Sequence, residues 1–122
     1  MSRGRLLLVD DDDDIRAIAR ISLERVGGWD VVAAGSAGEA EAAAREAAPD
    51  VVLLDVMMPD VDGPATLERL RPLIGAAPVV FLTAKTQPAD LERLNSLGAA
   101  GVIAKPFDPM ALPGEVAALV GS

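Results

Sequence analysis

Leu6-Leu7-Leu8-Val9 is followed directly by Asp10-Asp11-Asp12-Asp13-Asp14, so an apolar run ends where a block of aspartates begins. A short apolar run is typical of a buried strand, whereas closely packed carboxylates repel one another and resist burial. Water, a helix N-terminus or a divalent cation can compensate for that repulsion. A second junction has the same form, because Val51-Val52-Leu53-Leu54 is followed by Asp55. Two carboxylate sites at strand ends predict a metal-dependent site.

The composition narrows the class of protein. The chain has 122 residues, which fits one domain with a core of its own. Hydrophobic residues make up 51% of it and aromatic residues only 2%, so the predicted core is aliphatic. The chain contains neither cysteine nor histidine. This excludes disulfides, thiolate or imidazole metal ligands, and Ser-His-Asp catalysis by this chain alone.

Charge and hydropathy limit the partners that we expect. The net charge is −8, and no basic stripe is present, which argues against direct binding of nucleic acid. Arg3 and Arg5 precede only a four-residue apolar run, unlike a signal peptide, and no run approaches the ~20 residues of a membrane span. We therefore expect a cytoplasmic protein that contacts no membrane. We also expect residues 1–122 to form a single domain without an output domain.

Five short apolar runs alternate with longer amphipathic segments. The runs occupy residues 6–9, 31–34, 51–54, 79–82 and 101–104. They show no alternation of polar and apolar residues, which suits strands that are covered on both faces. Strands that alternate with helices predict an α/β fold with a parallel sheet. Because all strands of such a sheet point the same way, ligands bind at the edge where their carboxyl ends meet.

The first two intervening segments carry helix signals. The apolar positions expected on one face of the first helix are Ile15, Ile18, Ala19, Leu23 and Val26. Residues 12–14 suit its first turn, where the helix dipole favours negative charge, and Gly27 is expected to end it. Ser36 and Glu39 form a capping-box pattern before a second, alanine-rich helix, which must end by Pro49.

Prolines delimit the remaining helices. Pro64 is expected to open a third helix, which Pro72 limits, and Pro88 to open a fourth. The inward positions expected on the fourth helix are Leu91, Leu94 and Leu97. In the last segment Pro113 interrupts the pattern that opens at Asp108-Pro109. We therefore expect either a kinked helix there or a regular helix that starts only at Pro113.

Polar side chains follow four of the predicted strands. Asp10 and Asp11 follow the first, Asp55 the third, Thr83 the fourth and Lys105 the fifth. An aspartate can attack phosphorus, and a metal can offset the repulsion between carboxylate and phosphoryl oxygens. The donors are hard oxygens, which favours Mg²⁺. Lysine and threonine supply a charge and a hydrogen bond to phosphoryl oxygens. The set predicts phosphoryl transfer to a carboxylate.

Four segments in this order resemble the signature segments of a response-regulator receiver domain of two-component signalling, the chemotaxis-regulator (CheY-like) type. They are VDDDDDIR, LLDVMMPDVDG, FLTA and AKPF, and the resemblance covers essentially the whole chain. It implies a flavodoxin-like, doubly wound (βα)5 domain with strand order 2-1-3-4-5. It also implies that Asp55 is the phosphoacceptor and that Asp11 binds Mg²⁺ directly. Asp10 would assist through water, and the backbone carbonyl of Met57 would be a further ligand.

The resemblance assigns the remaining site residues and marks two departures. Thr83 would hydrogen-bond the phosphoryl group, and Lys105 would pair with its oxygens and precede a cis bond to Pro106. Where the family often has an aromatic switch residue, this chain has Val102. An aliphatic side chain cannot make an aromatic flip, so switching would run through the Thr83 loop and the fourth helix, or the response would be small.

The second departure concerns hydrolysis. In the family, the residue two after the acceptor and the residue two after the threonine tune the lifetime of the phosphoryl group. Here they are Met57 and Lys85. Neither is a carboxylate or an amide that readily orients an attacking water, so we expect a long-lived aspartyl phosphate.

The resemblance implies a signalling module that catalyses only its own phosphorylation and dephosphorylation. A histidine kinase or a histidine phosphotransfer protein would donate the phosphoryl group, and an unknown downstream protein would read the result. Two alternatives stay open. One is a small Mg²⁺-dependent phosphohydrolase with Asp10 as nucleophile and Asp12 as acid, although Asp55 follows the wrong strand for it. The other is a degenerate receiver that serves only as a protein-interaction module, and the intact polar set argues against it.

Overall fold

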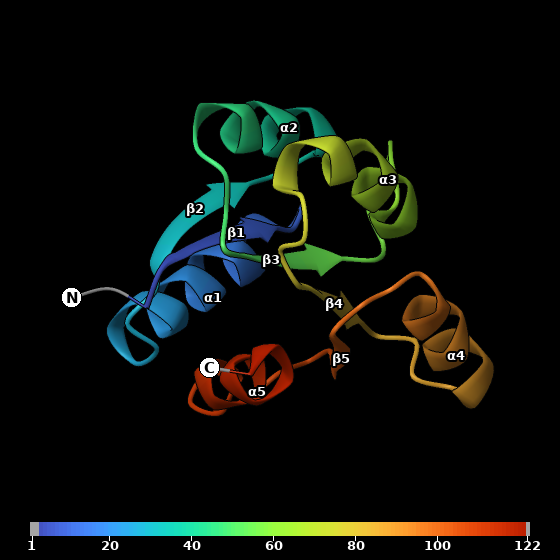
Figure 1. Cartoon of the computed structure of the whole chain (residues 1–122). Coiled ribbons are helices and arrows are strands. Elements are labelled where there is room, and N and C mark those ends of the chain that lie inside the picture. Colours follow the sequence, from blue (N-terminus) through green and yellow to red (C-terminus); the bar gives the residue numbers. More distant parts are fainter. Residues whose placement is uncertain (1–2, 122) are drawn as a thin grey trace.

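The computed structural model describes residues 3–121, in which five parallel strands alternate with five helices (Figure 1). The strands are β1 (Arg5–Val9), β2 (Asp30–Ala34), β3 (Val51–Asp55), β4 (Val79–Thr83) and β5 (Gly101–Ala104). The helices are α1 (Asp13–Arg25), α2 (Ala37–Glu46), α3 (Gly63–Ile74), α4 (Pro88–Ser96) and α5 (Leu112–Val120). The sheet order is β2-β1-β3-β4-β5, which confirms the predicted α/β class, the doubly wound (βα)5 arrangement and the strand order.

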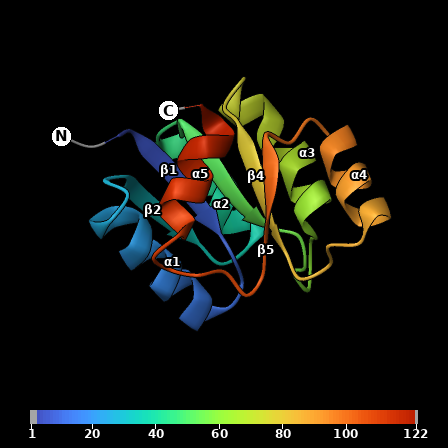
Figure 2. The same ribbon diagram turned by 90° about the horizontal axis from the view of Figure 1, so that it is seen from below.

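Helices cover both faces of the sheet, with α1 and α5 on one face and α2 and α3 on the other (Figures 1 and 2). Alternate residues of a strand point to opposite faces. Leu6 and Leu8 of β1 therefore pack in the cluster under α1 and α5, whereas Leu7 and Val9 pack in the cluster that includes α2, α3 and Leu94 of α4. This double cover explains why the strands read as unbroken apolar runs. None of the described helices is both long and apolar enough to cross a membrane.

The carboxyl ends of β1 and β3 lie side by side at the point where the strand order reverses. β1 pairs with β2 on one side and with β3 on the other, and Val9 is in register with Leu54. The residues that come next, Asp10 and Asp55, are therefore neighbours at the rim of the sheet. This switch point is where ligands bind in open α/β sheets.

Polar side chains cap two helix starts: the cap at Ser36 was predicted, whereas Asp12 was expected within the first turn and is the N-cap instead. Asp12 precedes α1, and its carboxylate accepts hydrogen bonds from the main-chain N–H groups of Asp14 and Ile15 at 2.9 and 3.1 Å. The Ser36 hydroxyl likewise accepts from the N–H of Glu39 at 3.2 Å. The Glu39 carboxylate reaches back to the N–H of Gly35 rather than to that of Ser36, which places the capping box one residue earlier on that side.

The predicted inward face of α1 is partly wrong. Ala19 and Leu23 are buried, but Ile18 and Val26 have 48% and 55% of their surface exposed. The buried stripe is instead completed by Ser22, whose hydroxyl donates a hydrogen bond to the carbonyl of Pro109 in the loop before α5. The hydroxyl of Ser22 thus has a partner in this loop, and Ser22 joins Ala19 and Leu23 on the buried side of α1 in place of Ile18.

Proline does not end α3 at the predicted position. The helix continues through Pro72 to Ile74, which is 6% exposed and belongs to the core. The Gly75 N–H closes the last turn by donating to the Arg71 carbonyl at 3.2 Å. Burial of Ile74 and this bond maintain the last turn although proline supplies no donor in it.

The helices α4 and α5 agree with the sequence predictions except at Leu97. Leu94 of α4 is buried, but Leu97 lies just beyond the helix and is 41% exposed, so it does not face inward as predicted. α5 begins at Leu112 with Pro113 in its first turn. This confirms the second of the two expectations for this segment, a regular helix that starts at the proline, to within one residue.

Candidate functional site

Four strand ends carry polar side chains at one edge of the sheet. Asp10 follows β1, Asp55 and Thr83 are the last residues of β3 and β4, and Lys105 follows β5. Leu82 pairs with Asp55, which places Thr83 one residue further along the same edge. The sequence therefore located all four residues correctly. The strands β3 and β4 extend one residue beyond the predicted apolar runs to include Asp55 and Thr83.

Lys105 is the cation between two buried carboxylates. Its Nζ lies 2.8 Å from Oδ2 of Asp10 and 3.2 Å from Oδ1 of Asp55. Main-chain groups hold the other contacts: the Asp12 N–H donates to Asp10 Oδ1 at 2.9 Å, and the Met57 N–H donates to Asp55 Oδ1 at 3.3 Å. Asp10 and Asp55 are 0% and 2% exposed, so both depend on these contacts in place of water.

One ammonium does not fully balance this much buried negative charge. Burial, and then the charge of Asp10, raise the pKa of Asp55 from 3.8 to about 6, and Lys105 only partly offsets them. Burial also disfavours the ammonium of Lys105, but its contacts with Asp10 and then with Asp55 outweigh this and raise its pKa above 10.5. Lys105 is therefore held in its charged form, and the negative charge of the two carboxylates still exceeds the positive charge beside them.

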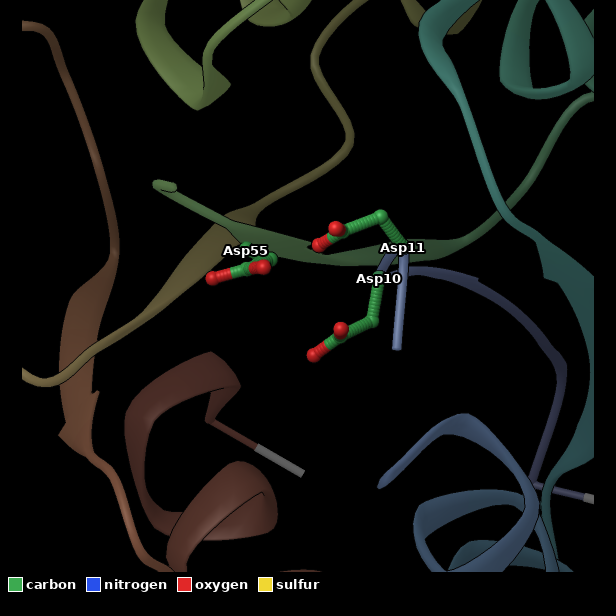
Figure 3. A group of neighbouring side chains, drawn as sticks. All are labelled: Asp10, Asp11 and Asp55. Atoms are coloured by element: carbon green, nitrogen blue, oxygen red, sulfur yellow. The ribbon is translucent and has the colours of Figure 1, made fainter. Parts of the chain in front are cut away.

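Asp11 completes a cluster of three carboxylates (Figure 3). Asp10, Asp11 and Asp55 each offer an oxygen within 4.8 Å of the oxygens of the other two. Asp11 is exposed, whereas the other two are buried, so the cluster opens to solvent on the Asp11 side. Hard oxygen donors and the excess of negative charge fit a small divalent cation such as Mg²⁺.

Thr83 faces the loop between β4 and α4. Its hydroxyl oxygen accepts a hydrogen bond from the Lys85 N–H at 3.0 Å and lies 3.3 Å from the Lys85 carbonyl. Thr83, Lys85 and Met57 line one hollow of about 110 Å³ beside α4. The Met57 side chain is 57% exposed there. The two residues expected to tune hydrolysis therefore flank the same space as the threonine.

The remaining features that the resemblance implied are located as follows. The peptide bond between Lys105 and Pro106 is cis, as expected. Val102 lies on β5, is half-buried and packs against the cluster shared by α2, α3 and α4. Asp12, the acid of the phosphohydrolase alternative, is exposed and caps α1 instead. Because its carboxylate is engaged in this cap, Asp12 is poorly placed to act as an acid, which counts against the phosphohydrolase alternative.

Sequence reasoning missed one side chain at this edge. Nη1 of Arg16 donates to the main-chain carbonyl of Asp10 at 2.7 Å, and its other terminal nitrogen forms an ion pair with Asp13. The available signal was the spacing of three residues between Asp13 and Arg16, which brings side chains together on a helix. The bond to Asp10 had no such local signal, because it depends on how α1 leaves the strand.

The comparisons with known proteins agree with this geometry. Residues 6–117 match the family model described as the response regulator receiver domain. The chain belongs to this family. Receiver domains are signalling modules of two-component systems, and the five-stranded order and the acidic cluster at the switch point are consistent with that membership.

Among solved structures, this receiver domain is similar to the chemotaxis response regulator CheY4 of Vibrio cholerae. The TM-score is 0.87 at 30% identity, over 95% of this chain and 98% of that one. Among curated proteins, it is 40% identical to the DNA-binding response regulator MtrA of Mycolicibacterium smegmatis over 95% of this chain and 50% of that protein. The transcriptional regulatory protein PhoP of Bacillus subtilis is 35% identical over 95% of this chain and 48% of that protein. This receiver domain thus spans about half the length of the curated relatives.

Proposed function

We propose that Asp55 of this receiver domain accepts a phosphoryl group from a phosphohistidine of a histidine kinase or a histidine phosphotransfer protein. The observation that supports this most is the position of the Asp55 carboxylate, buried at the switch point with Lys105 at 3.2 Å and two further carboxylates around it. The donor histidine must lie outside residues 1–122, which contain none.

In the proposed reaction, an oxygen of ionised Asp55 attacks phosphorus. A P–O bond forms as the P–N bond to the donor imidazole breaks, and the electron pair of that bond returns to the imidazole nitrogen. With a pKa of about 6, Asp55 is mostly ionised at neutral pH and is therefore competent as a nucleophile. Lys105 pairs with the phosphoryl oxygens as they approach the acidic rim.

We propose Mg²⁺ as the cation of this site, held directly by Asp11 and Asp55, through water by Asp10, and by the carbonyl of Met57. The ion would supply positive charge between the carboxylate and the phosphoryl oxygens, which otherwise repel. The hard oxygen donors and the charge imbalance support this choice.

Thr83 would carry the signal away from the site. Its hydroxyl is engaged with the main chain of Lys85, so a new bond to a phosphoryl oxygen would exchange one partner for another and pull on the β4–α4 loop. We propose that the change is read on the face formed by α4, β5 and α5 by a protein partner, not by nucleic acid bound to this domain. With Val102 on β5, the response would depend on the loop and α4.

The proposed role is that of a switch that catalyses only its own phosphorylation and dephosphorylation. The test is incubation of the wild type and of Asp55→Asn with acetyl phosphate and Mg²⁺, followed by intact mass measurement. We expect one added phosphoryl group in the wild type and none in the variant. An unchanged mass of the wild type, or equal labelling of both proteins, would refute the assignment. Turnover of a generic phosphate ester would instead favour the phosphohydrolase alternative.

A further inference from the structure

Arg16 lies on α1, yet its guanidinium is directed to the loop that carries the acidic cluster. Nη1 donates to the Asp10 carbonyl at 2.7 Å, and the second terminal nitrogen pairs with Asp13. Only 23% of the Arg16 side chain is exposed. A Cβ added at Gly35 would lie 3.0 Å from Nη1, so the guanidinium sits against the backbone of the β2–α2 loop. The guanidinium of Arg16 therefore connects the start of α1 to the end of β1, and the β2–α2 loop limits its movement.

These contacts hold the main chain of Asp10 from both sides. Its N–H donates to the Ala34 carbonyl of β2 at 3.1 Å, and its carbonyl accepts from Arg16. Asp11 follows directly, and its exposed side chain makes no hydrogen bond or ion pair within the described part of the chain. The Asp11 carboxylate is therefore held in place only through its own backbone, and the contact of Arg16 with the Asp10 carbonyl holds that backbone on the β1 side.

We propose that Arg16 is a positioning residue of the cation site, which presents the Asp11 carboxylate to an ion shared with Asp10 and Asp55. The inference rests on the proposed function, because it assumes that this cluster binds Mg²⁺. The contact that matters most is the hydrogen bond from Arg16 to the Asp10 carbonyl, and the ion pair with Asp13 orients the guanidinium. A planar, bidentate donor suits this task better than a single ammonium.

The charge of Arg16 and its proposed positioning role predict opposite changes in Mg²⁺ affinity when Arg16 is removed. The guanidinium is a positive charge beside a cation site, so its removal by itself would strengthen Mg²⁺ binding. Loss of the Asp13 ion pair would act in the same direction. If Arg16 positions the loop, its removal weakens binding, because Asp11 must then be ordered by the ion itself. The sign of the change separates positioning from a purely electrostatic or a purely stabilising role.

The experiment is a calorimetric Mg²⁺ titration of the full chain at a temperature where circular dichroism shows every protein folded. The proteins are the wild type, Arg16→Met, the charge-preserving Arg16→Lys, and the control Arg20→Met. Arg20 is on the same helix, and among residues 3–121 its one ion pair is with Glu24 at 3.5 Å, on the surface. We expect Arg16→Met to weaken binding at least fivefold, Arg16→Lys about threefold, and Arg20→Met less than twofold.

Binding by Arg16→Met that equals or exceeds that of the wild type would overturn the inference. If Arg16→Met does not fold, Arg16→Lys decides: wild-type Mg²⁺ affinity in that variant would show that the guanidinium geometry is not needed and would overturn the inference. A loss in Arg20→Met equal to that in Arg16→Met would also overturn it. Absence of Mg²⁺ binding by the wild type would refute the proposed cation site itself, whereas normal binding by every variant would refute only the role of Arg16.

Discussion

Asp55 shares its cationic partner with Asp10: Lys105 Nζ lies 3.2 Å from the first carboxylate and 2.8 Å from the second. The closer contact is to Asp10, so the ammonium is more strongly engaged by the residue that is not the proposed acceptor. Asp55 is left with burial and a like charge that its share of the ammonium does not cancel, which is why its pKa rises to about 6. We therefore expect the stability of the domain to depend on pH and on added cations.

We expect Asp55→Asn to be more stable than the wild type at pH 7.5 without Mg²⁺. The pKa of Asp55 is about 6 in the folded state against 3.8 as the reference, so between these values the folded state binds more protons than the unfolded state. The free energy of unfolding of the wild type then falls as pH rises from 4 to 6, by up to roughly 3 kcal/mol. The neutral asparagine avoids this penalty.

Urea unfolding at pH 7.5 and pH 4 in the presence of a chelator measures the effect. The advantage of Asp55→Asn should be largest at pH 7.5 and shrink toward pH 4, where the wild-type carboxyl is protonated. Asp60→Asn, at an exposed position in the following loop, is the matched control and should change stability by less than about 0.5 kcal/mol. A gain that grows as pH falls would contradict the proposed origin of the pKa shift.

Mg²⁺ should raise the thermal stability of the wild type, because a ligand that binds only the folded state stabilises it. At tenfold excess over the dissociation constant, the gain is about 1.4 kcal/mol, or a few degrees in Tm. Asp11→Asn should keep the metal-free Tm but lose the response, since Asp11 is exposed and only the ion needs it.

Asp14→Asn removes the same charge from the exposed first turn of α1 and is the control for the Asp11 variant. It should retain most of the Tm response to Mg²⁺. Differential scanning fluorimetry over a Mg²⁺ series, with Ca²⁺ in parallel, gives the comparison. A full response in Asp11→Asn would exclude Asp11 as a ligand.

The strand ends could be predicted from sequence because their signal is local. An apolar run that stops at Asp10 or Asp55 marks both the end of a buried strand and the chemistry at that end. The orientation of α1 could not be predicted, since Ile18 and Ser22 both suit an inward stripe until the loop at Pro109 supplies a partner for the hydroxyl. The contact of Arg16 with the Asp10 carbonyl could not be predicted for the same reason, because it joins two elements whose relative position only the fold determines.

Gly63 should be intolerant of a side chain because of its closeness to the acceptor strand. A Cβ there would lie 2.6 Å from the Asp55 carbonyl oxygen and 2.7 Å from the Val56 Cα, both of which are backbone atoms. We expect Gly63→Ala to cost about 1–3 kcal/mol and to slow labelling by acetyl phosphate, because Asp55 must shift. Gly114→Ala in α5 meets no atom within 4 Å and should instead stabilise the domain by about 0.5 kcal/mol. Equal stability of the two variants would contradict this account.

The lifetime of the phosphorylated state tests the roles of Met57 and Lys85. A lysine ammonium only donates hydrogen bonds and a thioether accepts them weakly, so neither side chain in this hollow orients a water for attack on phosphorus. We expect the wild-type aspartyl phosphate to persist for minutes or longer in Mg²⁺ buffer after removal of acetyl phosphate. Met57→Gln, which adds a carbonyl acceptor at an exposed position, should shorten its half-life several-fold.

The matched control is Met110→Gln, because Met110 is 73% exposed in the turn before α5 and lies outside that hollow. Loss of the phosphoryl group is followed by intact mass at timed intervals, at constant pH and Mg²⁺ concentration. Met110→Gln should decay at the wild-type rate, which separates a local effect of the amide from a general effect of a more polar surface. A wild-type lifetime of a few seconds, or acceleration by both substitutions alike, would show that water is activated by other groups than the residues flanking this hollow.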